Sequence, residues 1–185
     1  MIYTFNMLIC QKYEENKAIR KDVSKLYVDA FPRNERPPVN MFFRSFHKDS
    51  NHLFAFYEKE EFIGFCSTIT YKDISYIFFL AVSKNYRQQG YGTEILSHMK
   101  KIYKDYVIVL CYEEVDKKYK DYDLREKRRQ FYSKNGFQYN GFNTIEFGVN
   151  FSTCYYGKHP ISFLDYQEIF RLGFGEFALN FLKMA

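Results

Sequence analysis

The stretch that decides the fold runs from Tyr76 to Leu96 and reads YIFFLAVSKNYRQQGYGTEIL. It opens inside a continuous apolar run, ISYIFFLAV (74–82), that is rich in aromatic and β-branched residues. Continuous apolarity of this length predicts a strand covered on both faces. From Gly90 onward, apolar residues recur at helical spacing, which predicts an amphipathic helix. The segment RQQGYG therefore occupies the joint between a buried strand and a helix.

This joint has the composition of an anion-binding turn. The first N–H groups of a helix lack intrahelical partners, and the helix dipole places positive charge there. Glycines let a phosphate or pyrophosphate approach such a backbone, and a nearby arginine adds a full charge. A plain connection with two convenient glycines remains the alternative. The turn is neither a P-loop, since no Gly-Lys-Ser/Thr closes it, nor a Rossmann fingerprint, since G-x-G-x-x-G is absent.

The flanking segments predict a single α+β (mixed α/β) domain over residues 1–185. YVIVLCY (106–112) is a second apolar strand, so strand, helix and strand form a βαβ unit with a parallel core pair. The other expected strands are 2–9, the hairpin of 53–58 and 62–72, and two within 137–157. Helices are also expected over 11–30 and 39–48 and near 122–135, where Asp121 or Asp123 can cap the start and Gly136 can end the helix. The tail, 162–185, is expected to form one or two short helices that are broken at 172–175.

Composition limits the functional classes. The 185 residues carry a formal charge of +5, and the densest basic patch is REKRR (125–129). A solvated helix face is the first interpretation of this patch and an anion-binding face the alternative, and no DNA- or RNA-binding motif accompanies it. Four separated cysteines without CxxC spacing and scattered histidines predict free thiols in a reducing compartment and no metal site. The sequence opens without a signal peptide and holds no apolar run of membrane-spanning length, so a cytoplasmic protein is expected.

Two motifs in order resemble those of a known family. Arg-x-x-Gly-x-Gly, which follows an apolar strand ending in LAV and comes directly before an amphipathic helix, looks like the acetyl-CoA-binding motif of the GNAT N-acetyltransferase superfamily. FYSKNGF (131–137) resembles the second signature of that superfamily, a tyrosine-bearing helix end followed by Gly-Phe and a strand. The resemblance implies a mixed, mostly antiparallel central sheet with a splayed parallel pair and flanking helices, and acetyl-CoA as co-substrate.

The resemblance also assigns residues to the coenzyme. The end of the first strand should bond to the pantetheine arm and present an amide to the thioester carbonyl, and the following turn should hold the pyrophosphate. Tyr132 matches a tyrosine near the coenzyme sulfur and is expected to protonate the leaving thiolate; a packed core aromatic is the alternative. The implied coenzyme-binding residues are Leu80, Ala81, Val82, Arg87, Gln88, Gln89, Gly90, Tyr91, Gly92, Thr93 and Tyr132.

The sequence departs from the family pattern at two positions. Many relatives carry a glutamate base two residues before the leucine of LAV, where this chain has Phe78. An alkylammonium with a pKa near 10.4 must lose a proton before it attacks, so the reaction needs another base. Glu113 is the first candidate for this base, and Glu114 and Glu35 are the other candidates. Arg125 replaces an asparagine that often precedes the tyrosine by seven residues, which puts that coenzyme contact in doubt.

Three functional hypotheses follow. The first is an enzyme that moves acetyl from acetyl-CoA to a primary amine by direct attack in a ternary complex, since no cysteine has an evident nucleophilic setting. The second is a catalytically weak acyl-CoA-binding or regulatory module, favoured by Phe78. The third, a nucleic-acid-binding protein, rests on REKRR alone. We expect no metal, nucleic-acid or membrane partner, whereas the acceptor amine, small molecule or peptide, and a homodimer formed through the tail stay open.

Overall fold

The computed structural model describes residues 8–13, 16–33 and 36–185. Most of the strand expected over 2–9 lies outside these residues, as does Glu35; the first described strand is β1, Ile9–Lys12. No helix of the described segments is long and apolar enough to cross a membrane. Within the same segments, no group of three or more His, Cys, Asp or Glu residues is arranged to hold a metal ion.

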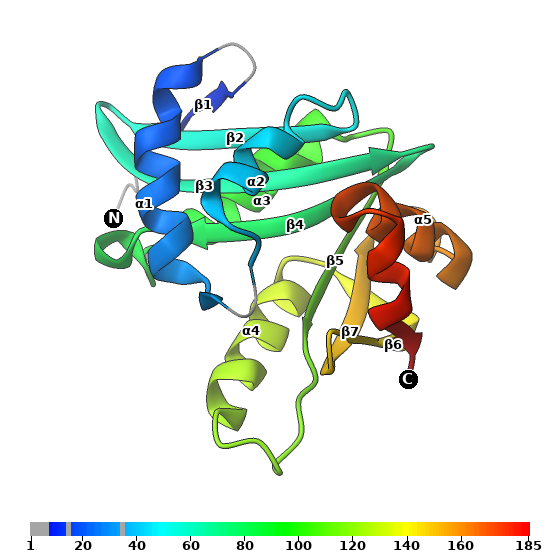
Figure 1. The fold of residues 1–185 in the computed structure, drawn as a ribbon. Coiled ribbons are helices and arrows are strands. Elements are labelled where there is room, and N and C mark those ends of the chain that lie inside the picture. Colours follow the sequence, from blue (N-terminus) through cyan, green and yellow to red (C-terminus); the bar gives the residue numbers. More distant parts are fainter. Residues whose placement is uncertain (1–7, 14–15, 34–35) are drawn as a thin grey trace. The chain divides into compact units, whose positions relative to one another are not determined.

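The described strands form a mixed, mostly antiparallel sheet flanked by helices, which confirms the α+β class (Figure 1). The strand order is β1-β2-β3-β4-β5-β7-β6-β8. Contacts divide the chain into two compact units, one made of residues up to 68 with 79–102 and one made of 69–78 with 103–185. The strands are β1, β2 (Asn51–Glu58), β3 (Glu61–Tyr71), β4 (Ile74–Val82), β5 (Val107–Glu113), β6 (Gln138–Glu146), β7 (Val149–Tyr156) and β8 (Leu182–Met184).

The first unit has an aromatic core between helices and strands. Its helices are α1 (Arg20–Ala30), α2 (Val39–Ser45) and α3 (Tyr91–Ile102), preceded by a 3₁₀ turn at Lys17–Ile19. Tyr27 of α1 stacks on Phe42 of α2 at 4.2 Å between ring centroids and meets Phe79 of β4 edge-on at 5.1 Å. Phe65 of β3 packs against the same rings, so α1 and α2 cover one face of these strands (Figure 1).

The second unit contains the predicted parallel strand pair. The N-terminal part of β4 pairs with β5 from Ile74↔Val107 to Ile77↔Leu110. These four residue pairs confirm the expected parallel pairing, and the strands themselves extend to Val82 in β4 and to Glu113 in β5. On its other side β5 pairs antiparallel with β7, and β7 pairs antiparallel with β6.

Successive β5 residues face the two helices of the second unit. The Cys111 thiol lies 3.2 Å from the hydroxyl of Tyr166 on α5 (Phe163–Phe174). The next residue, Tyr112, stacks on Tyr132 of α4 (Tyr122–Lys134) with 6.0 Å between ring centroids. Because neighbouring side chains on a strand point to opposite faces, α4 and α5 cover opposite faces of this part of the sheet.

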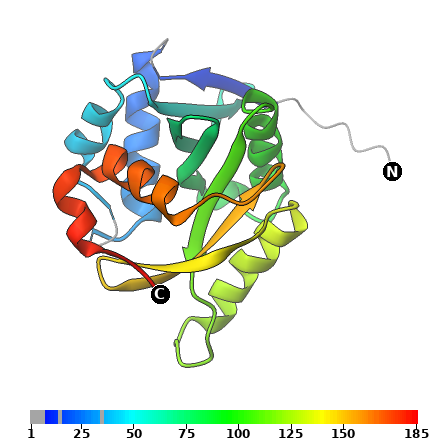
Figure 2. The ribbon, with the colours of Figure 1, turned by 90° about the vertical axis from the view of Figure 1, so that its right-hand side faces the viewer.

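The tail contains more structure than the sequence predicted. The Ser162 hydroxyl accepts the Asp165 N–H at 3.1 Å and so caps α5, and the helix ends at Gly175, whose φ of +89° few residues other than glycine adopt. A 3₁₀ segment, Glu176–Phe181, follows as the second short helix. The prediction of helices alone was wrong at the end of the chain, because β8 pairs antiparallel with β6 beside it (Figure 2).

The helix preceding the second motif was placed well from the sequence, but its cap was not. Asp121 occupies the N-cap position of α4 without a side-chain capping bond, because its carboxylate accepts from Arg125 Nε at 2.9 Å. At the other end, Gly136 adopts φ +79°, the left-handed conformation expected after this helix.

Candidate active site

The turn between β4 and α3 is exposed and left-handed at two positions. Gly90 has φ +91°, and a β-carbon added there would meet nothing within 4 Å. Gln88 has φ +63°, a conformation that is uncommon for a residue with a side chain and that the sequence did not predict. Residues 87–90 are all solvent-exposed. The corner is therefore open, and no protein side chain fills the space over Gly90.

The first turn of α3 supplies donors at this corner. The Glu94 N–H bonds to the Gly90 carbonyl at 3.2 Å, which makes Gly90 the start of the helical hydrogen-bond ladder. The amides of Tyr91 and Gly92 precede that bond, and such N-terminal amides have no partner within their own helix. The Tyr91 hydroxyl donates to Glu58 at 3.1 Å, so this side chain is held away from the backbone of its own turn.

Arg87 binds its own strand end. Its Nε donates to the Val82 carbonyl at 3.0 Å, and the Gln89 amide donates to the Asn85 carbonyl at 2.8 Å. These two contacts fix the shape of the connection through a short 3₁₀ segment at Lys84–Tyr86. Arg87 thus braces the turn in addition to placing positive charge beside it.

Gly64 of β3 holds the end of β4 in place, and sequence analysis did not assign it to the site. An added β-carbon would lie 2.3 Å from the Ala81 carbonyl oxygen and 3.2 Å from both the Val82 Cα and the Ile95 side chain. The signal was present in the sequence, because a lone glycine inside a strand indicates close approach of another backbone. Gly64 therefore permits the packing that positions residues 80–82.

The second unit holds the predicted acid, Tyr132. Its ring stacks on Tyr112 and lies 5.1 Å from the Phe131 ring and 6.1 Å from the Phe137 ring, measured between centroids. Its backbone carbonyl accepts the Phe137 N–H at 3.1 Å, which closes the helix end of the second motif. Packing on three sides fixes the ring of a half-buried tyrosine.

The predicted base, Glu113, is engaged by an arginine. Both carboxylate oxygens of Glu113 accept from Nη1 of Arg128. Its neighbour Glu114 accepts from Lys118 at 3.0 Å, from Tyr119 at 3.0 Å and from Asn150 at 3.2 Å. The bond from Lys118 is the main reason that the pKa of Glu114 is lowered. Cationic partners stabilise the ionised form of a carboxylate and so weaken it as a proton acceptor.

The basic patch on α4 is largely offset by carboxylates. Arg125 pairs with Asp121 at 2.9 Å and lies over the Tyr119 ring at 4.0 Å, Arg128 pairs with Glu113, and Arg129 bonds to Glu126 at 2.7 Å. Arg125 also donates to the Glu114 carbonyl at 3.1 Å. These contacts agree with the interpretation of REKRR as a charged helix face.

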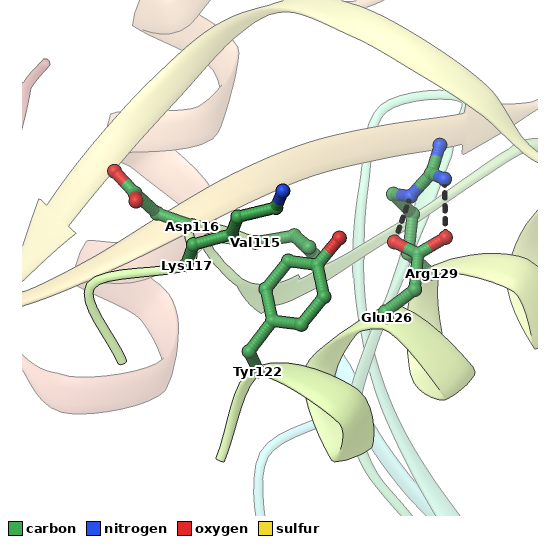
Figure 3. A pocket seen from close by; sticks show the side chains of 6 residues that line it. All are labelled: Val115, Asp116, Lys117, Tyr122, Glu126 and Arg129. Atoms are coloured by element: carbon green, nitrogen blue, oxygen red, sulfur yellow. Dashed lines mark hydrogen bonds and ion pairs between the residues drawn. The ribbon is translucent and has the colours of Figure 1, made fainter. Parts of the chain in front are cut away.

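A surface pocket of about 570 Å³ lies between α4 and the segment that follows β5. Figure 3 shows Arg129 bound to Glu126 on one side of it, with Tyr122, Asp116 and Lys117 around the rest. Apart from Glu126 and Arg129, which belong to REKRR, none of its lining residues was singled out from the sequence. It is distinct from the turn at 87–93, so it is a separate feature of the second unit.

Three of the four described cysteines, Cys66, Cys111 and Cys154, lack the features of a nucleophile. Desolvation raises the pKa of the Cys66 and Cys154 thiols, and it raises the pKa of Cys111 to about 12. A thiol becomes a nucleophile when it ionises, so these three groups are unreactive near neutral pH. Cys10, Cys66, Cys111 and Cys154 all lie in described segments, and none of them forms a disulfide.

Comparison with protein families matches residues 49–139 to the model described as "Acetyltransferase (GNAT) domain". The matched segment runs from β2 into β6 and contains both the turn at 87–93 and Tyr132. None of the curated proteins compared with the chain matches its sequence.

Solved structures share the fold at low sequence identity. A GNAT-family protein from Bacteroides thetaiotaomicron superposes with a TM-score of 0.74 and 18% identity, covering 91% of this chain and 99% of its own. An aminoglycoside 6'-N-acetyltransferase complexed with coenzyme A gives 0.65 and 16%, covering 83% and 99%. A mutant spermidine N-acetyltransferase from Vibrio cholerae gives 0.62 and 13%, covering 81% and 93%.

Proposed function

Because the chain belongs to the GNAT superfamily and is an acyltransferase of that type, we propose that it moves acetyl from acetyl-CoA to a primary amine. The amine attacks the thioester directly while both substrates are bound. The observation that carries this proposal is the open corner at Gly90, where φ is +91° and no atom lies within 4 Å of an added β-carbon.

The corner suits the diphosphate of coenzyme A. An anion at a helix N-terminus is stabilised by unpaired amides and by the helix dipole. Here those amides belong to the first turn of α3, and residues 87–90 leave them accessible. The residues that would hold the diphosphate are Arg87, Gln88, Gln89, Gly90, Tyr91, Gly92 and Thr93, and residues 80–82 would bond to the pantetheine arm.

The transfer step needs three contributions from the chain. A backbone amide within 80–82 would donate to the oxyanion that develops on the thioester carbonyl; losing one such donor costs roughly 3–4 kcal/mol in acyl transfer. The Tyr132 hydroxyl would protonate the departing thiolate. A base would take one proton from the ammonium. Arg128 donates to both carboxylate oxygens of Glu113, so an acceptor amine would have to compete with this arginine to reach Glu113.

The raised thiol pKa values favour direct attack over a covalent acetyl-enzyme. Cys66, Cys111 and Cys154 stay protonated near neutral pH and are therefore poor carriers of a covalently bound acetyl group. Direct attack in a ternary complex needs no enzyme nucleophile, whereas a route through an acetyl-enzyme does. The acceptor would be a primary amine that presents its free base to the thioester.

Release of free CoA thiol in the presence of amines tests the proposal. The panel should contain spermidine, an aminoglycoside and a short peptide with a free N-terminus and a lysine. The structural neighbours named for spermidine and aminoglycosides suggest the first two. Amine-dependent thiol release, with an acetylated product seen by mass spectrometry, would support the function. Thiol release that is independent of every amine would count against it.

The second candidate, an acyl-CoA-binding or regulatory module, is favoured by one observation. Phe78, which stands where many relatives have a glutamate, packs against Phe174 of α5 with 4.7 Å between ring centroids. An apolar contact of this kind cannot accept a proton. Tight acetyl-CoA binding by calorimetry, without thiol release for any amine of the panel, would favour the binding module.

A further inference from the structure

Two tyrosine side chains fasten the turn between β4 and α3 to the hairpin of β2 and β3. The Tyr91 hydroxyl, from the first residue of α3, donates to Oε2 of Glu58, the last residue of β2, at 3.1 Å. The Tyr86 hydroxyl donates to Oε2 of Glu61, the first residue of β3, at 3.3 Å. These four residues, here called the tyrosine clamp, all belong to the first unit. Its two bonds lie on either side of residues 87–90.

The two tyrosines of the clamp also contact each other. Their ring centroids lie 5.7 Å apart at an interplanar angle of 90°, which is the edge-to-face arrangement that aromatic pairs favour. Desolvation, together with the neighbouring carboxylate, raises the pKa of both Tyr86 and Tyr91, so both hydroxyls are protonated and can donate near neutral pH. The clamp is thus one connected group of two rings and two hydrogen bonds.

The start of the same connection is bonded to β3. The Ser83 N–H donates to the Ile63 carbonyl at 2.8 Å, and the Ser83 hydroxyl donates to the Phe62 carbonyl at 3.3 Å. Together with the clamp, these bonds attach the connection to the hairpin at three points along the chain. Residues 87–90, which contain the open corner, span the interval between the last two attachments.

The backbone between these attachments has a conformation that needs support. Gln88 has φ +63°, and a residue with a side chain keeps such a conformation only where the surrounding structure holds it. Residues 87–90 are solvent-exposed, and no atom lies within 4 Å of a β-carbon added at Gly90, so close packing does not supply that support. The contacts that hold the turn come from within it and from the clamp.

We propose that Tyr86 and Tyr91 are positioning residues, whose hydroxyls hold residues 87–90 in the coenzyme-binding conformation before acetyl-CoA arrives. The inference rests on one part of the proposed function, namely that this turn binds the diphosphate. A binding site that is already ordered avoids the cost of ordering it on binding. When only a fraction of the molecules has the competent conformation, the apparent Kd rises by the inverse of that fraction. The hydroxyls therefore act through the backbone of the turn.

The acetyl-CoA affinities of Tyr91→Phe and Tyr86→Phe, measured by calorimetry, test the proposal. Each substitution keeps the ring and the backbone amide and removes one hydroxyl. Loss of one such hydrogen bond should raise the Kd about two- to tenfold. The effect should be larger in Tyr91→Phe, because the bond of Tyr91 is shorter and partly buried, whereas that of Tyr86 is exposed. The double variant should bind more weakly than either single variant.

Substitutions of Glu58 separate the hydrogen bond from the charge. Glu58→Gln keeps an oxygen that accepts from the Tyr91 hydroxyl and removes the negative charge, so it should bind acetyl-CoA like the wild type. Glu58→Ala removes the acceptor and should match Tyr91→Phe. Combining Glu58→Ala with Tyr91→Phe should weaken binding little further, because both substitutions remove the same bond. If Tyr91→Phe does not fold, Glu58→Ala and Tyr86→Phe decide the question.

Tyr57→Phe is the matched control. Tyr57, next to Glu58 in β2, donates to Oδ2 of Asp22 on α1 at 3.0 Å, so it forms the same kind of tyrosine–carboxylate bond within the same unit. Neighbouring side chains of a strand point to opposite faces, so this bond lies on the other face of β2 from the clamp. Tyr57→Phe should lose stability much as Tyr91→Phe does, and it should keep the wild-type Kd for acetyl-CoA.

Hydrogen exchange in the free protein reports on the turn itself. The Tyr86 N–H bonds to the Ser83 carbonyl at 2.9 Å, and the Glu94 N–H bonds to the Gly90 carbonyl at 3.2 Å. In Tyr91→Phe these two amides should exchange faster than in the wild type, because the turn opens more often. The amides inside β3 should exchange at the wild-type rate, since the expected change is confined to the turn.

The outcomes separate this inference from the proposed function. Because binding is measured rather than transfer, a protein that binds acetyl-CoA but acetylates no amine would overturn the proposed transfer, while weaker binding in Tyr91→Phe would still support the clamp. Wild-type affinity in Tyr91→Phe, Tyr86→Phe and the double variant would overturn the inference alone. So would an equal loss of affinity in Tyr57→Phe, or unchanged exchange of the Tyr86 and Glu94 amides. A wild type that does not bind acetyl-CoA would overturn both proposals.

Discussion

A β-carbon at Gly64 would lie 2.3 Å from the carbonyl oxygen of Ala81, a distance that no real packing allows. The backbone of β3 therefore lies directly against the end of β4, which leads into the turn at Gly90. We predict that Gly64→Ala shifts residues 80–82, lowers the free energy of unfolding by about 1–3 kcal/mol and weakens acetyl-CoA binding. Urea unfolding and calorimetry would measure the two effects.

A surface substitution on α3 provides the comparison for Gly64. Ser97 is exposed on the helix that follows the turn, and Ser97→Ala should change neither quantity. If Gly64→Ala were as stable as the wild type and bound acetyl-CoA equally well, the end of β4 would tolerate displacement and the close approach would have no bearing on the coenzyme.

Gly90→Val should abolish acetyl-CoA binding while the protein stays folded. A β-branched side chain would cover the open corner and would carry strain of roughly 1–2 kcal/mol at positive φ. Gly148→Val is a matched control, because Gly148 has φ +85° and also has nothing within 4 Å of an added β-carbon. Both variants should lose similar stability. Equal acetyl-CoA affinity in the two, measured by calorimetry, would show that the corner does not bind the coenzyme.

Tyr132→Phe should lower kcat by about 10²-fold and leave acetyl-CoA affinity nearly unchanged, because general acid catalysis contributes at that scale. The substitution keeps the ring that stacks on Tyr112. Tyr112→Phe is the comparison, since it keeps the same stacked pair and removes the other hydroxyl. Steady-state kinetics with saturating amine would compare the two variants. A wild-type kcat in Tyr132→Phe would show that Tyr132 contributes to packing and not to acid catalysis.

Incubation with acetyl-CoA in the absence of amine should leave the protein unmodified. The raised pKa values of Cys66, Cys111 and Cys154 keep these thiols protonated at pH 7, and ionisation would begin only as the pH approaches those values. Intact-protein mass spectrometry should show no acetyl adduct, and stopped-flow detection of thiol should show no burst. A stoichiometric adduct on any cysteine would replace direct attack with a covalent route.

The local parts of this structure could be read from the residues themselves. The apolar run at 74–82, the strand at 107–113 and the helix at 122–134 follow from spacing and turn residues, and the structure confirms them within a residue or two. Gly136 and Gly175 take the left-handed conformations that end their helices. Gly64 was readable in principle, as a lone glycine in a strand.

The rest could not be predicted because it depends on distant contacts. The pairing of β8 with β6 gives the short tail segment Leu182–Met184 its strand conformation. The tyrosine-rich composition does not say which hydroxyl meets a carboxylate, and Arg128 was expected to be a solvated charge before its contact with Glu113 was known. Each of these results is decided by partners far along the chain.

The sequence alone determined the central strand–helix–strand unit, its parallel pair and the glycine-containing turn, because these depend on hydrophobic periodicity and on backbone freedom at single residues. Only the tertiary structure decided which carboxylates are neutralised by arginine or lysine and which, Glu58 and Glu61, accept from tyrosine hydroxyls. The physical reason is that a hydrogen bond needs two groups within about 3 Å of each other, and folding decides which side chains from different elements come that close.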